Sequence, residues 1–155
     1  MCWQCDHPGA TRQDYLDVLR STVMKEGWAV QYVETEPPFG YTVGLSEAGL
    51  PELLITGLPP ERSMLLLNAV AGYMVREVTP APGDIFTFPD RSCAEFVEVT
   101  HPDVHMGWAV AFRDGPIRGL QVVWLDADGH SPWCPDFNIG GPRQPVLGDR
   151  GPVDT

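Results

Sequence analysis

The sequence is poor in basic residues and lacks long hydrophobic runs. Only 10 of its 155 residues are Lys or Arg, against 21 Asp or Glu, so the net charge at pH 7 is −11. Nucleic acids and anionic membranes both attract Lys and Arg side chains. No apolar run approaches the ~20 residues that cross a bilayer, and the N-terminus lacks the basic and apolar regions of a secretory signal. We therefore expect no nucleic-acid partner, no membrane contact and a cytoplasmic location.

Several familiar motifs are also missing. The sequence contains no glycine-rich phosphate loop, no Gly-x-Ser-x-Gly elbow and no His-Glu-x-x-His zinc motif. Its four cysteines are too few for a disulfide-stapled secreted fold, and a close Cys pair in a reducing compartment more often marks a metal or redox site. These absences exclude the easily identified nucleotide binders, hydrolases and zinc proteases.

The order of periodic segments predicts one α+β domain. Hydrophobic residues form 43% of the chain, which is enough for a core. Helical spacing predicts a helix at about 12–26, a second that starts at Pro59-Pro60, and a short one from His101 through Ala111. Strand patterns occur at about 28–34, 39–45, 52–56, 84–88, 94–100 and 119–125. A mainly antiparallel or mixed sheet packed against two main helices accommodates this order.

The expected domain organisation has three parts. Residues 1–10 form an N-terminal arm that contains two cysteines, and residues 11–139 form the single α+β domain. Residues 140–155 are rich in Gly and Pro, and we expect them to form a loosely ordered tail.

The N-terminal arm carries a metal-binding pattern, Cys2-x-x-Cys5-x-His7. Two thiolates at this spacing can bind one Zn²⁺, and the imidazole can reach the same tetrahedron. The fourth ligand would come from Cys93, His101, His105, His130 or Cys134. The alternatives are a flexible arm, a redox-active pair, or a Cys2 nucleophile exposed by removal of Met1. In the zinc interpretation the cofactor is Zn²⁺ and its ligands include Cys2, Cys5 and His7.

A second group of polar residues follows the last predicted strand. Asp126 and Asp128 lie in a turn at the strand end, where binding sites often form. Their spacing is similar to that of a calcium loop, but the third acidic ligand and the closing Glu are missing, so a simple hairpin turn competes with that interpretation. His130 and Cys134 are close enough in sequence to join a metal or thiolate site.

One predicted strand has an unusually open face. Gly40, Thr42 and Gly44 alternate with larger residues over 39–45 and therefore share one side of the strand. Small side chains there allow a backbone, a helix or a ligand to approach closely.

Three motifs together resemble a known bacterial family. They are Tyr41-Thr42-x-Gly44-Leu45, Pro51-Glu52-Leu53 and Gln121-x-x-Trp124-x-Asp126-x-x-Gly129-x-x-Pro132-Trp133. The pattern resembles a family catalogued as a domain of unknown function and numbered 4262, over about residues 2 to 148, and Cys2-x-x-Cys5-Asp6-His7-Pro8 is similar to the start of one subgroup. Cys134 departs from the pattern, because many members have an acidic residue there. The resemblance implies a single folded domain, no particular activity, and a set of signature residues: Tyr41, Thr42, Glu52, Gln121, Trp124, Asp126 and Trp133.

The signature residues have two interpretations. They line a groove for a small molecule or for a protein or peptide partner, or their polar members lock strand ends and turns by hydrogen bonds. The first interpretation makes the chain a ligand- or partner-binding module. The alternatives are a metal- or cysteine-dependent enzyme acting on a small molecule or peptide, with Glu52 or Asp126 as acid or base, and a regulatory protein whose acidic surface meets a basic partner.

Overall fold

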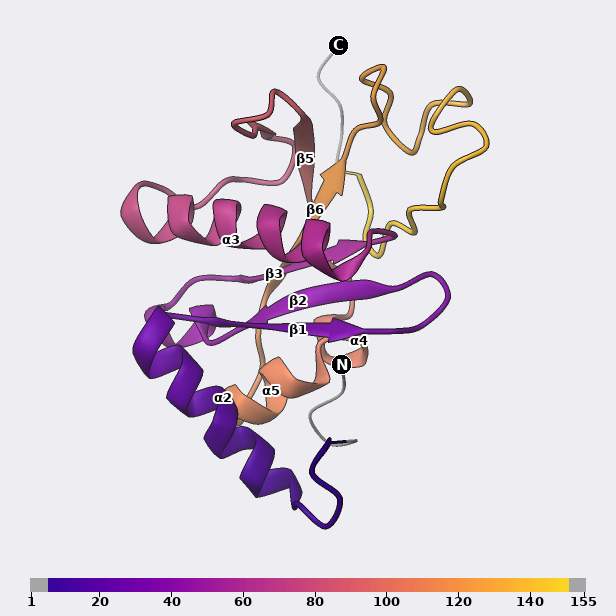
Figure 1. Ribbon diagram of the computed structural model, residues 1–155. Helices are drawn as coiled ribbons and strands as arrows, with labels where there is room; N and C mark the ends of the chain where they lie inside the picture. Colours follow the sequence, from indigo (N-terminus) through magenta and orange to yellow (C-terminus); the bar gives the residue numbers. More distant parts are fainter. Residues whose placement is uncertain (1–5, 151–155) are drawn as a thin grey trace.

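A mixed six-stranded sheet separates two helical layers in the computed structural model, which describes residues 6–150 (Figure 1). The strand order across the sheet is β1-β2-β3-β6-β5-β4. Neighbouring strands are antiparallel except the central pair β3 and β6, which run parallel. The strands are β1 (Ala29–Val33), β2 (Phe39–Val43), β3 (Glu52–Thr56), β4 (Ile85–Thr87), β5 (Cys93–Glu98) and β6 (Gly119–Trp124). The predicted α+β class is confirmed.

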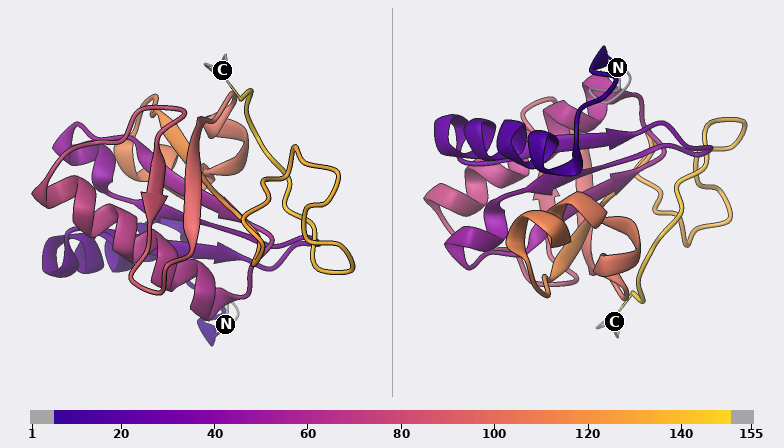
Figure 2. Two further views of the ribbon diagram at one scale, coloured as in Figure 1. Left: turned by 90° about the horizontal axis from the view of Figure 1, so that it is seen from above. Right: turned by 90° about the horizontal axis from the view of Figure 1, so that it is seen from below.

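The helices divide unequally between the two faces of the sheet (Figures 1 and 2). One face is covered by α3 (Pro60–Arg76), and the other by α2 (Arg12–Glu26), α4 (Pro102–His105) and α5 (Gly107–Arg113). The bounds of α2 are those predicted, because a Thr11–Asp14 capping box begins it and Gly27, at φ 96°, ends it. None of the helices within residues 6–150 has the length and apolar character that a bilayer crossing requires.

Apolar side chains on both faces of the central strands form two cores. Leu53 and Ile55 of β3 pack with Leu67 of α3 in one core, whereas Leu54 belongs to the core beneath α2 and α5. Successive side chains of a strand point to opposite faces, so a strand covered on both sides must be apolar throughout. Every residue of β3 and β6 is buried, which explains why their sequences are continuous runs without polar side chains, apart from Glu52, Thr56 and Gln121.

The open face of β2 is filled by a helix. A Cβ on Gly40 would lie 3.6 Å from Cδ1 of Leu67, so α3 packs against Gly40. Gly44 does not share this face as predicted, because a Cβ there would lie 2.7 Å from Cγ2 of Val23, on α2 in the other helical layer. The strand ends at Val43, two residues earlier than predicted. Gly44 then adopts φ 111° and leads into a 3₁₀ turn, η1 (Leu45–Ala48).

The chain after β6 forms a long irregular segment, residues 125–150, at one end of the sheet (Figure 2). This end holds the carboxyl ends of the parallel strands β3 and β6. The segment returns along the sheet, where Thr100 donates its backbone N–H to the carbonyl of Leu147 at 3.0 Å. The described part of the tail that composition led us to expect as loosely ordered is therefore attached to the sheet by specific hydrogen bonds.

Candidate metal centre

Glu52 is a signature residue that is fully buried at the start of β3. Oε1 accepts hydrogen bonds from the Thr42 hydroxyl at 2.8 Å and the Leu45 N–H at 3.1 Å. Oε2 accepts from the Gly44 N–H at 2.9 Å, the Ser46 N–H at 3.1 Å and the Ser46 hydroxyl at 2.9 Å. Burial raises the pKa of the Glu52 carboxyl, and these hydrogen bonds oppose the rise. The side chain closes the turn between β2 and η1 from inside.

Tyr41 faces the core beneath α2 and α5, with 2% of its surface exposed. Its hydroxyl oxygen accepts the backbone N–H of Trp108, in α5, at 3.0 Å. Burial raises the pKa of the Tyr41 hydroxyl from 10.0 to about 12. The phenol thus joins β2 to α5 in its neutral form.

Tyr41→Phe should reduce the amount by which the free energy of unfolding falls between pH 10 and pH 12. Because Tyr41 ionises near pH 10 when unfolded and near pH 12 when folded, its contribution is complete below pH 10 and is lost as the pH rises to about 12. The loss amounts to about 2–3 kcal/mol in the wild type. Urea unfolding of both proteins below pH 10 and near pH 12 measures it. Equal losses in the two proteins would contradict the expectation.

Gln121 and Trp124, on β6, form hydrogen bonds with residues 144–147, in the part of the C-terminal segment that runs back along the sheet; we call this part, residues 144–150, the returning chain. The Gln121 amide donates to the carbonyl of Pro145 at 2.8 Å and accepts the N–H of Leu147 at 2.7 Å. The backbone N–H and carbonyl of Trp124 form two bonds with the side chain of Gln144, at 2.9 and 2.8 Å. The polar groups of Gln121 and the backbone of Trp124 therefore bond to other parts of the same chain, which is the arrangement expected if the signature residues stabilise the fold by hydrogen bonds.

Asp126 organises the loop that follows β6. Its carboxylate accepts the backbone N–H groups of Asp128 at 3.0 Å, His130 at 2.8 Å and Asn138 at 2.7 Å. The bond from Asn138, followed by those from His130 and Asp128, lowers the pKa of the Asp126 carboxyl. The carboxylate therefore stays ionised and holds both ends of residues 126–138 together.

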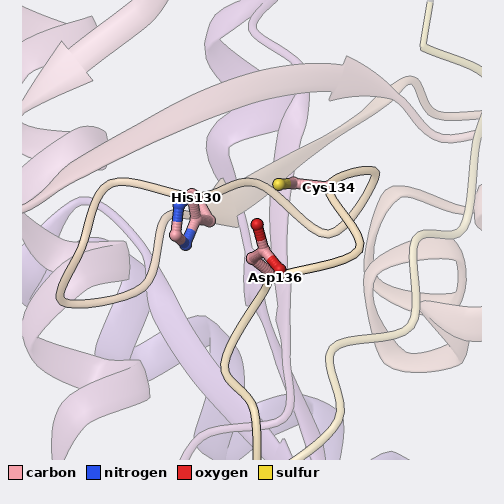
Figure 3. A group of neighbouring side chains, drawn as sticks. All are labelled: His130, Cys134 and Asp136. Carbon is pink, nitrogen blue, oxygen red and sulfur yellow. The ribbon is translucent and has the colours of Figure 1, made fainter.

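Three side chains of metal-binding type converge in this loop: His130, Cys134 and Asp136 (Figure 3). A ring nitrogen, the thiol sulfur and a carboxylate oxygen all lie within 4.8 Å of one another. His130 and Cys134 are partly buried, and Asp136 is exposed. We call these residues the 130–136 cluster. A second group, Asp126, Asp128 and His130, meets the same distance criterion.

One nitrogen of the His130 imidazole lies next to the carboxylate of Asp126. This nitrogen, Nδ1, has no exposed surface and lies 3.4 Å from Oδ2 of Asp126, which is within ion-pair distance but is not aligned for a hydrogen bond. The ring as a whole remains partly open to solvent, because 36% of the side chain is exposed.

Comparison with known proteins identifies the family. A family model described as a domain of unknown function (DUF4262) matches residues 22–138. The chain belongs to this family. Searches of curated proteins and of solved structures found no match. The resemblance derived from the motifs is thus confirmed, and the matched part of this DUF4262 domain contains the Glu52 turn and the 130–136 cluster.

The signature residues of the DUF4262 domain do not gather in one site. Tyr41 lies under α5, the pair Thr42 and Glu52 closes a turn, and Gln121 and Trp124 hold the returning chain. A cavity of about 240 Å³ opens in the loop. None of the seven signature residues is among its lining residues, which are Pro132, Phe137, Asn138, Gly141, Pro142, Arg143, Gln144 and Pro145. Ligand binding by the signature residues stays a prediction.

Trp133, the last signature residue, is fixed by the returning chain. The guanidinium of Arg150 lies 4.4 Å from the centre of the Trp133 ring. Arg150 also forms two 3.0 Å hydrogen bonds with the carboxylate of Glu95, on β5. The loop that bears the 130–136 cluster is therefore connected to β5 through Arg150, in addition to the hydrogen bonds by which Asp126 holds its two ends together.

Two of the residues that the sequence offered as further metal ligands lie in the 130–136 cluster. His130 and Cys134 were candidates from their spacing, whereas Asp136 was missed because Cys-Pro-Asp is no known metal motif. Successive turns, closed by Cys134 N–H to Ser131 O and Phe137 N–H to Cys134 O, bring Asp136 to the thiol. Of the N-terminal trio, His7 is exposed, and Cys2 and Cys5 lie outside the described residues, so their zinc site stays a prediction.

Proposed function

We propose that this DUF4262 domain is a metal-binding module that holds a zinc-type divalent cation with His130, Cys134 and Asp136. The convergence of their ligand atoms within 4.8 Å supports the proposal. An imidazole nitrogen, a thiolate and a carboxylate are the donor types of protein zinc sites. Three protein ligands leave one tetrahedral position open, which suits a site that also binds water or a small molecule.

The surroundings of His130 suit a metal ligand. Metal-bound histidines usually turn their other ring nitrogen toward a carboxylate, which fixes the ring. Asp126 supplies such a carboxylate, 3.4 Å from Nδ1, and three backbone N–H groups hold it ionised. Because Nδ1 has no exposed surface, Nε2 is the nitrogen left for the cation.

The position of the 130–136 cluster also suits a binding site. Open sheets with parallel strands bind ligands outside the carboxyl ends of those strands, and residues 125–150 lie at that end of β3 and β6. Irregular segments of this length in compact domains are usually either functional or disordered, and this one is held to the sheet by hydrogen bonds such as those of Gln121 with Pro145 and Leu147. A small molecule bound at the open metal position is the ligand that we assign to the binding module.

Elemental analysis of purified variants tests the proposal. We use a Cys2→Ser/Cys5→Ser background, which removes the predicted N-terminal site from the count. This protein should carry one zinc per chain, Cys134→Ser in the same background should carry none, and Cys93→Ser should keep it. Cys93 is the matched control because it is also partly buried but lies on β5. A zinc-free background protein, or zinc retained by Cys134→Ser, would contradict the proposal.

The zinc content of two aspartate variants, measured in the same background, shows which aspartate is the third ligand. Asp136→Asn should release zinc, whereas Asp128→Asn should not, because Asp128 belongs only to the second group. The opposite result would move the site to Asp126, Asp128 and His130. Wild-type protein with two zinc ions per chain, one of them lost in Cys2→Ser/Cys5→Ser, would support the N-terminal site as well.

One observation favours a second candidate function, a thiol-dependent enzyme. Asp126, His130 and Cys134 follow one another as carboxylate, imidazole and thiol, the order in which an oriented base activates a cysteine. His130 would take the proton from the thiol, and the thiolate would attack an acyl carbon of the substrate; the bond from that carbon to its leaving group would break, and the leaving group would take the proton from His130. This function predicts that zinc-free protein reacts with iodoacetamide at Cys134 and that His130→Gln slows the reaction.

A further inference from the structure

The solvent side of α3 carries three exposed apolar side chains among polar ones. Met64, Leu65 and Val75 expose 48%, 60% and 55% of their surface, although the opposite side of the helix is packed in the core through residues such as Leu67 and Val70. Figures 1 and 2 show α3 as the only helix on its face of the described chain, with its outer side uncovered.

The exposed residues have the spacing of a helix–helix seam. Leu65, Asn68, Gly72 and Val75 follow one another at intervals of three and four, which keeps them on one side of the helix. Gly72 lies in the middle of this seam without a side chain. Among residues 6–150, only Nη2 of Arg76 lies within 4 Å of a Cβ built there, apart from the helix's own backbone, so a neighbouring helix can approach closely.

We infer that α3 binds α3 of a second copy of this chain in antiparallel orientation. A two-fold axis between Asn68 and Ala69 places Leu65 of each copy opposite Gly72 of the other, so that a large side chain meets a gap. The same axis places Glu61 opposite Arg76 at both ends of the seam. The helix is therefore complementary to itself in both shape and charge.

Charge decides the orientation. In a parallel pair Glu61 would face Glu61 and Arg76 would face Arg76, whereas the antiparallel pair forms two contacts of opposite sign. Arg76 is exposed and now donates to the carbonyl of Gly72 at 3.0 Å. On association its guanidinium exchanges this carbonyl for the carboxylate of the second copy and leaves Gly72 free for Leu65.

The surface area that the helix pair buries indicates how tightly the two copies associate. A helix of 17 residues is about 25 Å long. Contacts along one such helix pair bury less than the ~800 Å² per partner of a standard stable interface. The dimer is therefore one that forms at high protein concentration and dissociates on dilution.

Sedimentation equilibrium over a range of concentrations tests the inference. Wild-type protein should shift from monomer to dimer as concentration rises, and Leu65→Glu should remain monomeric. Met24→Glu is the matched control, because Met24 is 82% exposed on α2 and should leave the dimer unchanged. A wild type that stays monomeric at millimolar concentration, or a Leu65→Glu variant that dimerises like wild type, would overturn the inference.

Charge exchange tests the orientation in the same instrument. Glu61→Arg and Arg76→Glu should each weaken association by about 5-fold, since two exposed charge pairs per dimer become repulsive. The double variant restores both pairs with reversed sign and should associate like wild type. Double-variant protein that is weaker than either single variant would exclude the antiparallel seam. All these positions are exposed, and circular dichroism confirms that the variants fold.

Discussion

Glu52→Ala should lower the free energy of unfolding by about 4 kcal/mol. The change removes the acceptor for the backbone N–H groups of Gly44, Leu45 and Ser46, all of which lie in a buried turn. A buried donor without an acceptor costs about 1–3 kcal/mol, and the space left by the side chain adds to the loss. Urea unfolding at neutral pH measures the change, with folding monitored by circular dichroism.

Two further variants separate the loss of the hydrogen bonds from the loss of a nearby charge and from the loss of side-chain volume at this turn. Glu47→Ala alters an exposed residue of η1, whose ion pair with Arg20 spans 3.7 Å, and should cost less than about 1 kcal/mol. Glu52→Gln fills the space and keeps one acceptor oxygen, so it should recover part of the stability that Glu52→Ala loses. If Glu52→Ala proves no more harmful than Glu47→Ala, Glu52 does not hold the turn.

Gln121→Leu should release the returning chain and lower the free energy of unfolding by about 3 kcal/mol. The variant keeps an apolar side chain in the sheet but leaves the Pro145 carbonyl and the Leu147 N–H without their partner. Trypsin should then cleave native protein faster after Arg143 and Arg150, which flank the attached stretch. Peptide mapping of timed digests identifies the cut sites.

The matched control for this variant is Gln13→Leu. Gln13 lies on the exposed side of α2, and its replacement should change stability by less than about 0.5 kcal/mol. If tryptic cleavage at Arg143 and Arg150 is equally slow in both variants, Gln121 does not attach the chain to the sheet.

Local chemistry made the helices and strands predictable. Thr11 with Asp14 and the left-handed Gly27 mark the ends of α2, and both signals depend only on neighbours in the sequence. The strand beginning at Phe39 was predicted two residues too long. Its end depends on Glu52, whose carboxylate binds the backbone at Gly44, and that contact cannot be inferred from the alternation of residues 39–45.

Pairing between distant segments was not predictable. The parallel register of β3 and β6, in which Glu52 lies opposite Gly119, joins segments almost seventy residues apart. The attachment of the C-terminal segment has the same origin, since Gln121 bonds to backbone groups of Pro145 and Leu147. From composition alone a Gly/Pro-rich segment is expected to be loosely ordered. Composition does not show which side chains elsewhere in the chain form hydrogen bonds with the backbone of that segment.

The candidate site was partly visible in the sequence. His130 and Cys134 stand four residues apart, and this spacing suggested a shared site. Asp136 required the turns of the folded loop, and the role of Asp126 required the three backbone N–H groups that point at it. The polar signature residues form the internal hydrogen bonds expected in one of the two interpretations, while their use in ligand binding remains a prediction.

Cobalt(II) titration of the Cys2→Ser/Cys5→Ser protein tests the metal-binding proposal most directly. Tetrahedral cobalt bound by a thiolate gives a sulfur-to-metal charge-transfer band in the near ultraviolet. We predict that this band saturates at one equivalent, that zinc displaces it, and that Cys134→Ser abolishes it while Cys93→Ser does not. Absence of the band, or its persistence in Cys134→Ser, would contradict a metal centre at His130, Cys134 and Asp136.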